Sequence, residues 1–244
     1  MEKMRLDKIL SNSGLGSRKE VKQIIKSGEV YVSKKRITDP GYLVDPDKEN
    51  ILVNGEPLYY KKFYYLMMNK PAGVITATRD LNAQTVIDLL SHPYDKFNLF
   101  PVGRLDKDTE GLLILTNDGK LAHQLLSPKK HVSKTYYAEV TGKVGNNDIQ
   151  AFKQGIQLDK DYITLPAELK ILEAADISRV IINVYEGKFH QIKRMFNALS
   201  KKVIYLKRLS MSSLKLDESL KPGSYRELTP SELESIIISS KENC

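Results

Sequence analysis

The N-terminal part of the chain combines two helical patterns with short apolar runs. Apolar side chains recur at helical spacing within residues 5–12 and again after Ser17, which predicts two helices. The hydroxyl of Ser17 can cap the second helix, and Gly28 suits the left-handed conformation that ends it. Apolar runs at residues 29–32 and 51–54 predict short strands. Together these elements predict a small module with a modest core.

Beyond this module, predicted strands and helices are mixed. Strands are predicted at residues 65–69, 73–76, 112–116, 134–141, 179–185 and 203–211. Helices are predicted at residues 85–90, 119–126, 148–154, 190–199 and 230–238. Their order lacks the strict alternation of a barrel or doubly wound sheet, so the predicted fold class is α+β. The predicted organisation is a small helix-rich domain at 1–58, a linker at 59–63 and a mixed-sheet domain at 64–244.

The composition is that of a globular protein, since 41% of the 244 residues are hydrophobic and 28% are charged. No uncharged stretch approaches the roughly 18–20 residues needed to span a bilayer, and the charged beginning of the chain lacks the apolar run of a signal peptide. The single cysteine, Cys244, argues against an internal disulfide or a cysteine-based zinc cluster. We therefore expect a cytoplasmic protein without a membrane segment, and a monomer because no dimer seam is evident.

Basic residues are concentrated in three segments. Residues 1–36 contain ten Lys and Arg against four Asp and Glu, whereas residues 37–60 contain one Lys against five acids. Residues 120–134 contain four Lys and no acid, and residues 186–215 contain eight Lys and Arg against Glu186 alone. This distribution, with a net charge of +8, favours an extended groove for a phosphate backbone over solubility alone.

The densest acidic segment of the larger predicted domain lies at residues 103–111 (GRLDKDTEG) between two apolar runs. One interpretation is a charged turn between strands. Another is a calcium-binding loop beginning at Asp106, but that loop needs a bidentate Glu at its twelfth position, where this chain has Asn117. The acidic segment is followed by an apolar run typical of a strand, whereas a calcium-binding loop of this kind is followed by a helix. The sequence therefore favours the turn, and no metal site is predicted.

Five short phrases match one protein family in order and spacing. They lie at residues 69–73 (NKPAG), 103–106 (GRLD), 115–119 (LTNDG), 134–136 (KTY) and 186–196 (EGKFHQIKRMF). Over nearly its whole length, the chain resembles the bacterial rRNA pseudouridine synthases of the RsuA type. Its beginning, residues 5–10 (RLDKIL) and 16–18 (GSR), resembles the αL-type, ribosomal protein S4-like RNA-binding domain that commonly precedes the catalytic domain.

The resemblance implies roles for four residues. Asp106 matches the aspartate that these synthases need for catalysis, and Tyr136 matches the tyrosine that packs on the target base. Lys193 matches a basic position that pairs with the aspartate, and Arg104 matches an arginine that helps occupy the space left by the displaced base. Many relatives carry arginine at this position. Lys193 keeps the positive charge of arginine but lacks its planar two-pronged guanidinium.

Further RNA-binding candidates come from the basic segments and the matched phrases. They are Arg5, Arg18, Lys19, Lys22, Lys26, Lys70, Arg104, His190 and Arg194. Arg18, Lys22 and Lys26 form a stripe on the second predicted helix, which suits a solvated face and an RNA contact equally well. His190 has no second His or Cys at metal-ligand spacing, so we expect a structural or RNA-facing role. Arg194 is either a phosphate contact or a surface charge.

The implied reaction converts uridine to pseudouridine by breaking the N1–C1′ bond, turning the uracil and rejoining it through C5. No atom is gained or lost, so we expect no cofactor and no metal. The uridine must leave the RNA stack to react. Whether Asp106 attacks C1′, adds to C6 or removes the 2′ proton stays open.

The phrases at residues 155–158, 166–167 and 222–229 most resemble the branch that acts on small-subunit (16S) rRNA, free or in an assembling particle. The alternatives are a large-subunit (23S) rRNA site, or a non-catalytic RNA-binding or ribosome-assembly factor.

Overall fold

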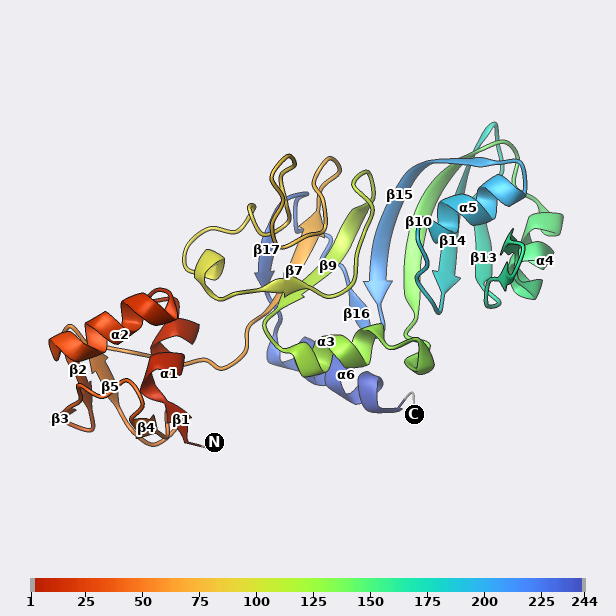
Figure 1. The fold of residues 1–244 in the computed structure, drawn as a ribbon. Helices are drawn as coiled ribbons and strands as arrows, with labels where there is room; N and C mark the ends of the chain where they lie inside the picture. Colours follow the sequence, from red (N-terminus) through yellow and green to blue (C-terminus); the bar gives the residue numbers. More distant parts are fainter. Residues whose placement is uncertain (1–2, 243–244) are drawn as a thin grey trace. The chain divides into compact units, whose positions relative to one another are not determined.

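The computed structural model describes residues 3–242, so Cys244 lies outside the described residues. It divides into two compact units, each coloured by sequence in Figure 1. The N-terminal unit runs to Tyr64 and includes Leu90–Leu99, and the C-terminal unit comprises the rest. The sequence boundaries assign residues 90–99 to the larger domain, whereas the structure groups them with the N-terminal unit. Phe97 stacks on Tyr64 there, with ring centroids 3.8 Å apart.

Two helices and a small sheet form the N-terminal unit. The helices are α1 (Leu6–Asn12) and α2 (Arg18–Ser27). The four-stranded sheet has the order β3 (Lys35–Arg36), β2 (Val30–Val32), β5 (Ile51–Val53) and β6 (Glu56–Pro57), and β1 (Met4–Arg5) pairs separately with β4 (Leu43–Val44). A single apolar cluster between the helices and the strands forms the core of the unit.

The local signals in the sequence explain these two helices. Leu6, Ile9 and Leu10 of α1 are fully buried. The Ser17 hydroxyl caps α2 in a reciprocal box, and Gly28 ends the helix at a φ of 81°. The positive φ favours glycine, and a Cβ there would lie 2.0 Å from a guanidinium nitrogen of Arg36, which would have to give up its bond to the Gly28 carbonyl. The predicted second helix is confirmed, caps included.

A mixed nine-stranded sheet forms the C-terminal unit. Its main path runs β13 (Glu168–Glu173), β14 (Ile177–Val184), β10 (Lys134–Thr141), β15 (Lys202–Met211), β9 (Glu110–Thr116), β7 (Tyr65–Lys70) and β17 (Tyr225–Glu227). Short strands β8 (Phe100–Pro101) and β16 (Leu214–Lys215) flank β9 and β15, and β11 (Gln157–Asp159) with β12 (Tyr162–Ile163) makes a separate hairpin. The central pair β15–β9 is parallel, and the other pairs are antiparallel.

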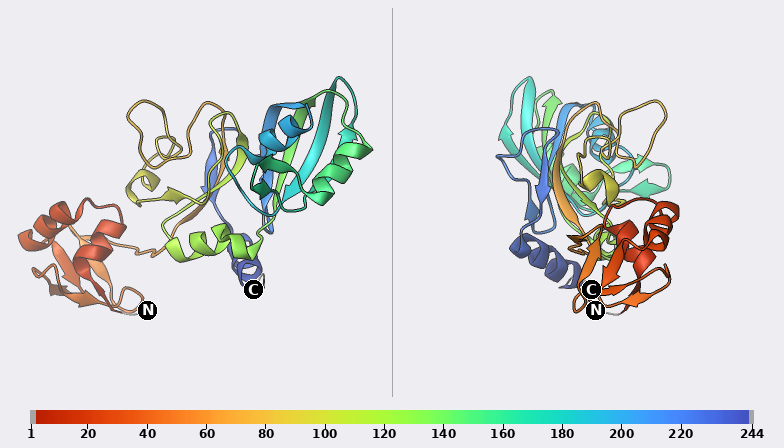
Figure 2. Two further views of the ribbon diagram at one scale, coloured as in Figure 1. Left: turned by 45° about the vertical axis from the view of Figure 1, so that its right-hand side comes forward. Right: turned by 90° about the vertical axis from the view of Figure 1, so that its left-hand side faces the viewer.

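Helices cover the two halves of this sheet differently. Helices α4 (Asn146–Gln154) and α5 (Gln191–Ala198) lie on one face of the half that contains β13, β14, β10 and β15 (Figures 1 and 2). At the other half, α3 (Gly119–Leu126) packs with α6 (Pro230–Glu242) over a core of β7 and β9 side chains. The predicted α+β class is confirmed. Within residues 3–242, no helix has the length and apolar character needed to cross a membrane.

Two predicted elements do not form. Residues 85–90 make a turn instead of a helix. Thr85 and Asp88 do form the hydrogen bonds of a capping box, but no helical turn follows it. Residues 73–76 make no regular strand. Ile75 forms only an isolated bridge with Thr85. Gly73 donates to the carbonyl of Lys107, and Thr76 bonds the backbone of Leu105.

Arg226 of β17 bonds the beginning of α6, and these bonds make the stability of the fold depend on acid pH. It makes two hydrogen bonds of 2.8 Å to Glu232 and one of 2.7 Å to Asp217. Arg226 lowers the pKa of Glu232 to about 2, and the Ser219 hydroxyl together with Arg226 lowers that of Asp217 to about 2. The folded state therefore binds protons less tightly than the unfolded state. The resulting stabilisation is complete above about pH 4.5 and is lost as pH falls toward 2.

We expect Arg226→Met to lower the free energy of unfolding by about 1 kcal/mol at pH 7, because the paired bonds to Glu232 are lost. The variant should also lose less stability than the wild type between pH 5 and pH 3. Urea unfolding followed by circular dichroism measures both effects, with the exposed Lys221→Met as the matched control. Equal acid sensitivity of Arg226→Met and the wild type would contradict the assignment.

Candidate active site

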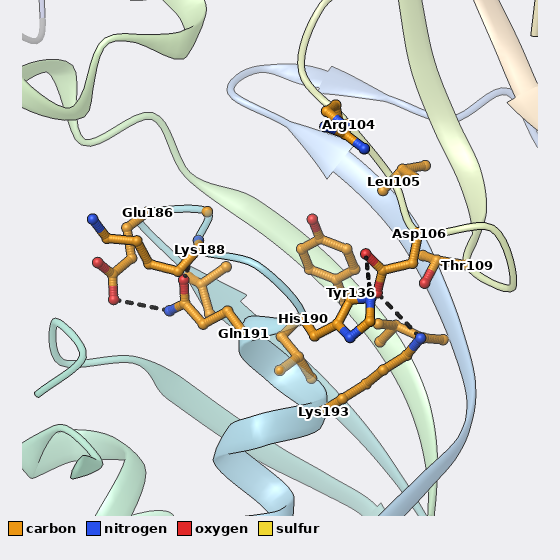
Figure 3. A pocket seen from close by; sticks show the side chains of 14 residues that line it. Arg104, Leu105, Asp106, Thr109, Tyr136, Glu186, Lys188, His190, Gln191 and Lys193 are labelled. Atoms are coloured by element: carbon orange, nitrogen blue, oxygen red, sulfur yellow. Dashed lines mark hydrogen bonds and ion pairs between the residues drawn. The ribbon is translucent and has the colours of Figure 1, made fainter. Parts of the chain in front are cut away.

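Asp106, Tyr136 and Lys193, which lie far apart in the sequence, line one pocket of the C-terminal unit (Figure 3). The loop that contains Asp106 forms one side, and Tyr136 of β10 with Leu206 of β15 contributes the inner surface. The segment that leads into α5 and the first turn of that helix form the opposite wall, and Lys193 lies in that first turn. The pocket holds about 470 Å³ of empty space, including its open mouth. The three predicted residues are thus brought together.

A tight turn presents Asp106. The amide of Thr109 donates to the Asp106 carbonyl at 3.1 Å, which closes the turn just before β9 begins. The Asp106 side chain is 25% exposed, so the carboxylate is partly shielded while still reachable from the pocket. The calcium interpretation fails here, because β9 follows the loop where an exiting helix would be needed.

Lys193 lies between two carboxylates. Its Nζ is 3.1 Å from Asp106 Oδ2 and 2.5 Å from Asp108 Oδ1. Burial alone would lower the pKa of Lys193, but the bonds to Asp108 and Asp106 outweigh burial and raise it. The bond from Lys193 lowers the pKa of Asp108. The opposite oxygen of Asp106, Oδ1, lies 3.6 Å from His190 Nε2 (Figure 3).

Tyr136 contributes an aromatic ring to the pocket. Buried and half-exposed residues alternate along β10, and Tyr136 is on the buried face with 9% of its surface exposed. Its neighbour Tyr137 points to the other face of the sheet, where it donates to Glu139. Strand alternation alone could not say which tyrosine would face the pocket, and the register of β10 decides it. Arg104 is exposed and lines the same pocket.

The wall before α5 is fixed by a hydrogen-bond network around Glu186. This carboxylate accepts bonds from the Tyr162 hydroxyl, from the Leu165 amide at 2.9 Å and from the Gln191 amide group at 2.9 Å. Gln191 in turn accepts from the backbone amide of Lys188. The network holds His190, the N-cap residue of α5, and the first turn of α5, which carries Lys193. Glu186 and Gln191 had no assigned role, although both stand in the matched phrase at residues 186–196.

Lys70 corrects an RNA-binding prediction. Its side chain is fully buried, and its Nζ donates to the carbonyls of Pro71, Lys107 and Thr109 at 2.9, 3.3 and 2.9 Å. Burial lowers its pKa to about 8, so the ammonium form still dominates at neutral pH. Three carbonyl acceptors match the three donors of an ammonium group. Lys70 therefore supports the turn of Asp106 from beneath, where RNA cannot touch it.

Two further RNA-binding candidates are engaged within the protein. Arg194 pairs with Asp159 of the β11–β12 hairpin at 2.6 Å, which ties α5 to that hairpin. Arg5 pairs with Asp7 at 2.8 Å. Their charges are partly compensated, so a phosphate contact by either one would compete with these pairs. By contrast, the basic side chains of α2, namely Arg18, Lys19, Lys22 and Lys26, are exposed.

Thr109 was not singled out from the sequence, yet it also lines the pocket. Its side chain is 1% exposed, and its Oγ1 has no hydrogen-bond partner among the described residues. A buried hydroxyl without a partner is costly. Thr109 thus places a buried hydroxyl, unpaired within residues 3–242, directly behind the wall of the pocket.

Comparison with known proteins identifies both units. Residues 64–198 match the family described as RNA pseudouridylate synthase. Residues 4–50 match the S4 domain. The first match includes Asp106, Tyr136 and Lys193.

Similar proteins cover nearly the whole chain. The uncharacterized RNA pseudouridine synthase YtzG of Bacillus subtilis (strain 168) is 52% identical over 94% of this chain and 97% of its own length. The ribosomal small subunit pseudouridine synthase A of Vibrio vulnificus (strain CMCP6) is 37% identical over 96% of this chain and 99% of its own. The ribosomal large subunit pseudouridine synthase B of Bacillus subtilis (strain 168) is 36% identical over 94% and 93%.

A solved structure has the same fold. The crystal structure of a pseudouridylate synthase superposes with a TM-score of 0.67 at 34% identity, covering 96% of this chain and 99% of that one.

Proposed function

Since the chain belongs to the RNA pseudouridylate synthase family and carries an S4 domain, we propose that it isomerises a specific uridine of small-subunit (16S) rRNA, with Asp106 as the catalytic carboxylate. Its family makes it an isomerase, which argues against a purely RNA-binding assembly factor. The observation that carries the assignment of Asp106 is the convergence of Asp106, Tyr136 and Lys193 in one pocket.

The geometry supports a division of roles among these residues. Isomerisation needs a carboxylate that can act as nucleophile or base on the extruded nucleotide. The Lys193 ammonium offsets the cost of shielding the Asp106 charge from water. The Tyr136 ring offers a surface on which the freed uracil can stack, so that it turns within the pocket instead of escaping. Extrusion of the uridine costs a few kcal/mol, which contacts to the RNA backbone can offset.

Small-subunit rRNA is the proposed substrate because the phrases at residues 155–158, 166–167 and 222–229 resemble that branch. Three Vibrio relatives at 37–38% identity are named for the small subunit. A large-subunit site is the second candidate, since one relative at 36% identity is named for the large subunit.

Pseudouridine mapping of both rRNAs in a strain that lacks the gene distinguishes these substrates. We expect one 16S position to lose its pseudouridine and to regain it when the gene is restored. Loss of a mark from 23S rRNA alone would overturn the substrate assignment.

The exposed stripe on α2 predicts how RNA affinity depends on salt. Replacing Arg18, Lys22 and Lys26 with glutamine removes three cations, so the slope of log affinity against log salt should become shallower by roughly 2–3. A filter-binding titration of an rRNA fragment at several salt concentrations measures this slope. The matched control replaces the exposed Lys143, Lys153 and Lys170 of the C-terminal unit, with the same change in charge. If both triple variants give the same slope, α2 is not the specific RNA contact.

A further inference from the structure

Asp108 contacts the ammonium of Lys193, and none of the roles proposed above for Asp106, Tyr136 and Lys193 requires this contact. It stands two residues after Asp106 in the same turn, and both carboxylates reach the Lys193 ammonium. The contact to Asp108 is the shorter one, 2.5 Å against 3.1 Å. The Asp108 side chain is 72% exposed, whereas Lys193 is 21% exposed. Lys193 is thus held from the solvent side by one carboxylate and from the pocket side by the other.

A lysine at this position needs a second anchor for a physical reason. An arginine can hold a carboxylate through two parallel bonds, whereas an ammonium is a compact charge at the end of a flexible four-carbon stem. A single contact to Asp106 would leave Lys193 free to swing toward RNA phosphates at the mouth of the pocket. The second contact, to Asp108, restricts the ammonium to the position beside Asp106.

The two carboxylate oxygens of Asp106 have different neighbours. Oδ2 is occupied by Lys193, whereas Oδ1 lies 3.6 Å from the partly exposed imidazole of His190. With Lys193 fixed by Asp108, the ammonium stays at Oδ2, and the imidazole of His190 lies beside Oδ1. Loss of the anchor would let the ammonium leave Oδ2, so that Asp106 would no longer have one fixed cation beside it.

We propose that Asp108 is a positioning residue for the isomerisation, acting through Lys193, and that it takes over the geometric restraint which the fork of an arginine would provide. This inference rests on the proposed function of Asp106. Because Asp108 touches neither the sugar nor the base in this role, its removal should slow the chemical step without weakening RNA binding.

The decisive comparison uses Asp108→Ala in the natural Lys193 background and in a Lys193→Arg background. Single-turnover tritium release from C5-labelled uridine in rRNA gives the rate, and filter binding gives the RNA affinity. We expect Asp108→Ala to lower the rate roughly 10- to 100-fold. RNA affinity should stay within about twofold, since Asp108 makes no contact with RNA in this role and the lost negative charge can only strengthen binding slightly. Asp108→Asn keeps an oxygen acceptor for Lys193 and should lose less than about fivefold. In the Lys193→Arg background, Asp108→Ala should cost less than about threefold.

Lys107→Ala is the matched control, since Lys107 is exposed in the same turn and should leave the rate unchanged within about twofold. A full rate in Asp108→Ala, an equal loss in the natural and Lys193→Arg backgrounds, or an effect on RNA affinity alone would each overturn the proposal.

A second measurement does not depend on catalysis. The side-chain ammonium resonance of Lys193, identified by its absence in Lys193→Arg, should be observable by NMR in the wild type and lost to solvent exchange in Asp108→Ala. If the wild type isomerises no rRNA, the proposed function fails, while this resonance still tests whether Asp108 holds Lys193. An unchanged resonance in Asp108→Ala would overturn the anchoring role whatever the activity.

Discussion

Replacing Asp106 by asparagine should lower the rate of uridine isomerisation by at least about 10³-fold while RNA binding stays intact. Asparagine keeps the shape of the side chain and can still accept a hydrogen bond from Lys193, but it carries no charge and is a poor nucleophile and base. The side chain is partly exposed at the turn, so the substitution should leave the fold unaffected. The variant therefore separates the chemistry of the carboxylate from its structural contacts.

Tritium release from C5-labelled uridine under single-turnover conditions measures this loss, and filter binding with the same RNA measures affinity. Asp161→Asn, a change at an exposed aspartate outside the pocket, serves as the control. Equal turnover by Asp106→Asn and the wild type would remove Asp106 from the mechanism.

The second large effect is expected at Lys70. Replacing it with methionine fills much of the same volume but removes all three hydrogen bonds to the carbonyls of Pro71, Lys107 and Thr109. Methionine avoids the cost of burying a charge, which offsets part of the loss. We expect a net fall of about 2 kcal/mol in the free energy of unfolding. Because the turn that carries Asp106 loses its support, the isomerisation rate should also fall roughly 100-fold.

Urea unfolding and single-turnover kinetics test both parts of this prediction. Lys107→Met is the matched control, because it removes an exposed lysine from the same turn. An RNA-contact role for Lys70 would instead give a variant with weaker RNA binding, normal stability and a normal rate at saturating RNA. That outcome would contradict the supporting role.

Much of the fold could be predicted because the deciding signals are local. The period of apolar residues in α1 and the capping residues of α2 act within a few positions of the chain, so they hold in the tertiary structure. The two failures show the limit of such signals. Residues 85–90 contain a complete capping box, but the structure forms only a turn there. Gly73 and Thr76 bond the loop of Asp106, and Ile75 bonds residues 84 and 86, so the partners of this segment lie outside the local sequence.

The site itself was predicted through matched phrases and not through local physics. Asp106, Tyr136 and Lys193 belong to three distant segments, and nothing in any one segment shows that they meet. Lys70 shows the opposite case. Its charge and its place in a matched phrase suggested an RNA contact, yet only the packing of β7 under the turn of Asp106 shows that it is buried.

By itself, the sequence determined the class of fold and the two helices of the N-terminal unit. It also determined the residues to which the family assigns chemistry. All of these depend on spacing and residue type. Only the tertiary structure decided which cations face solvent, which tyrosine of β10 lines the pocket and which carboxylates share Lys193. Those outcomes depend on strand register and on contacts between residues far apart in the chain, where a shift of one residue or a few ångströms changes the partner.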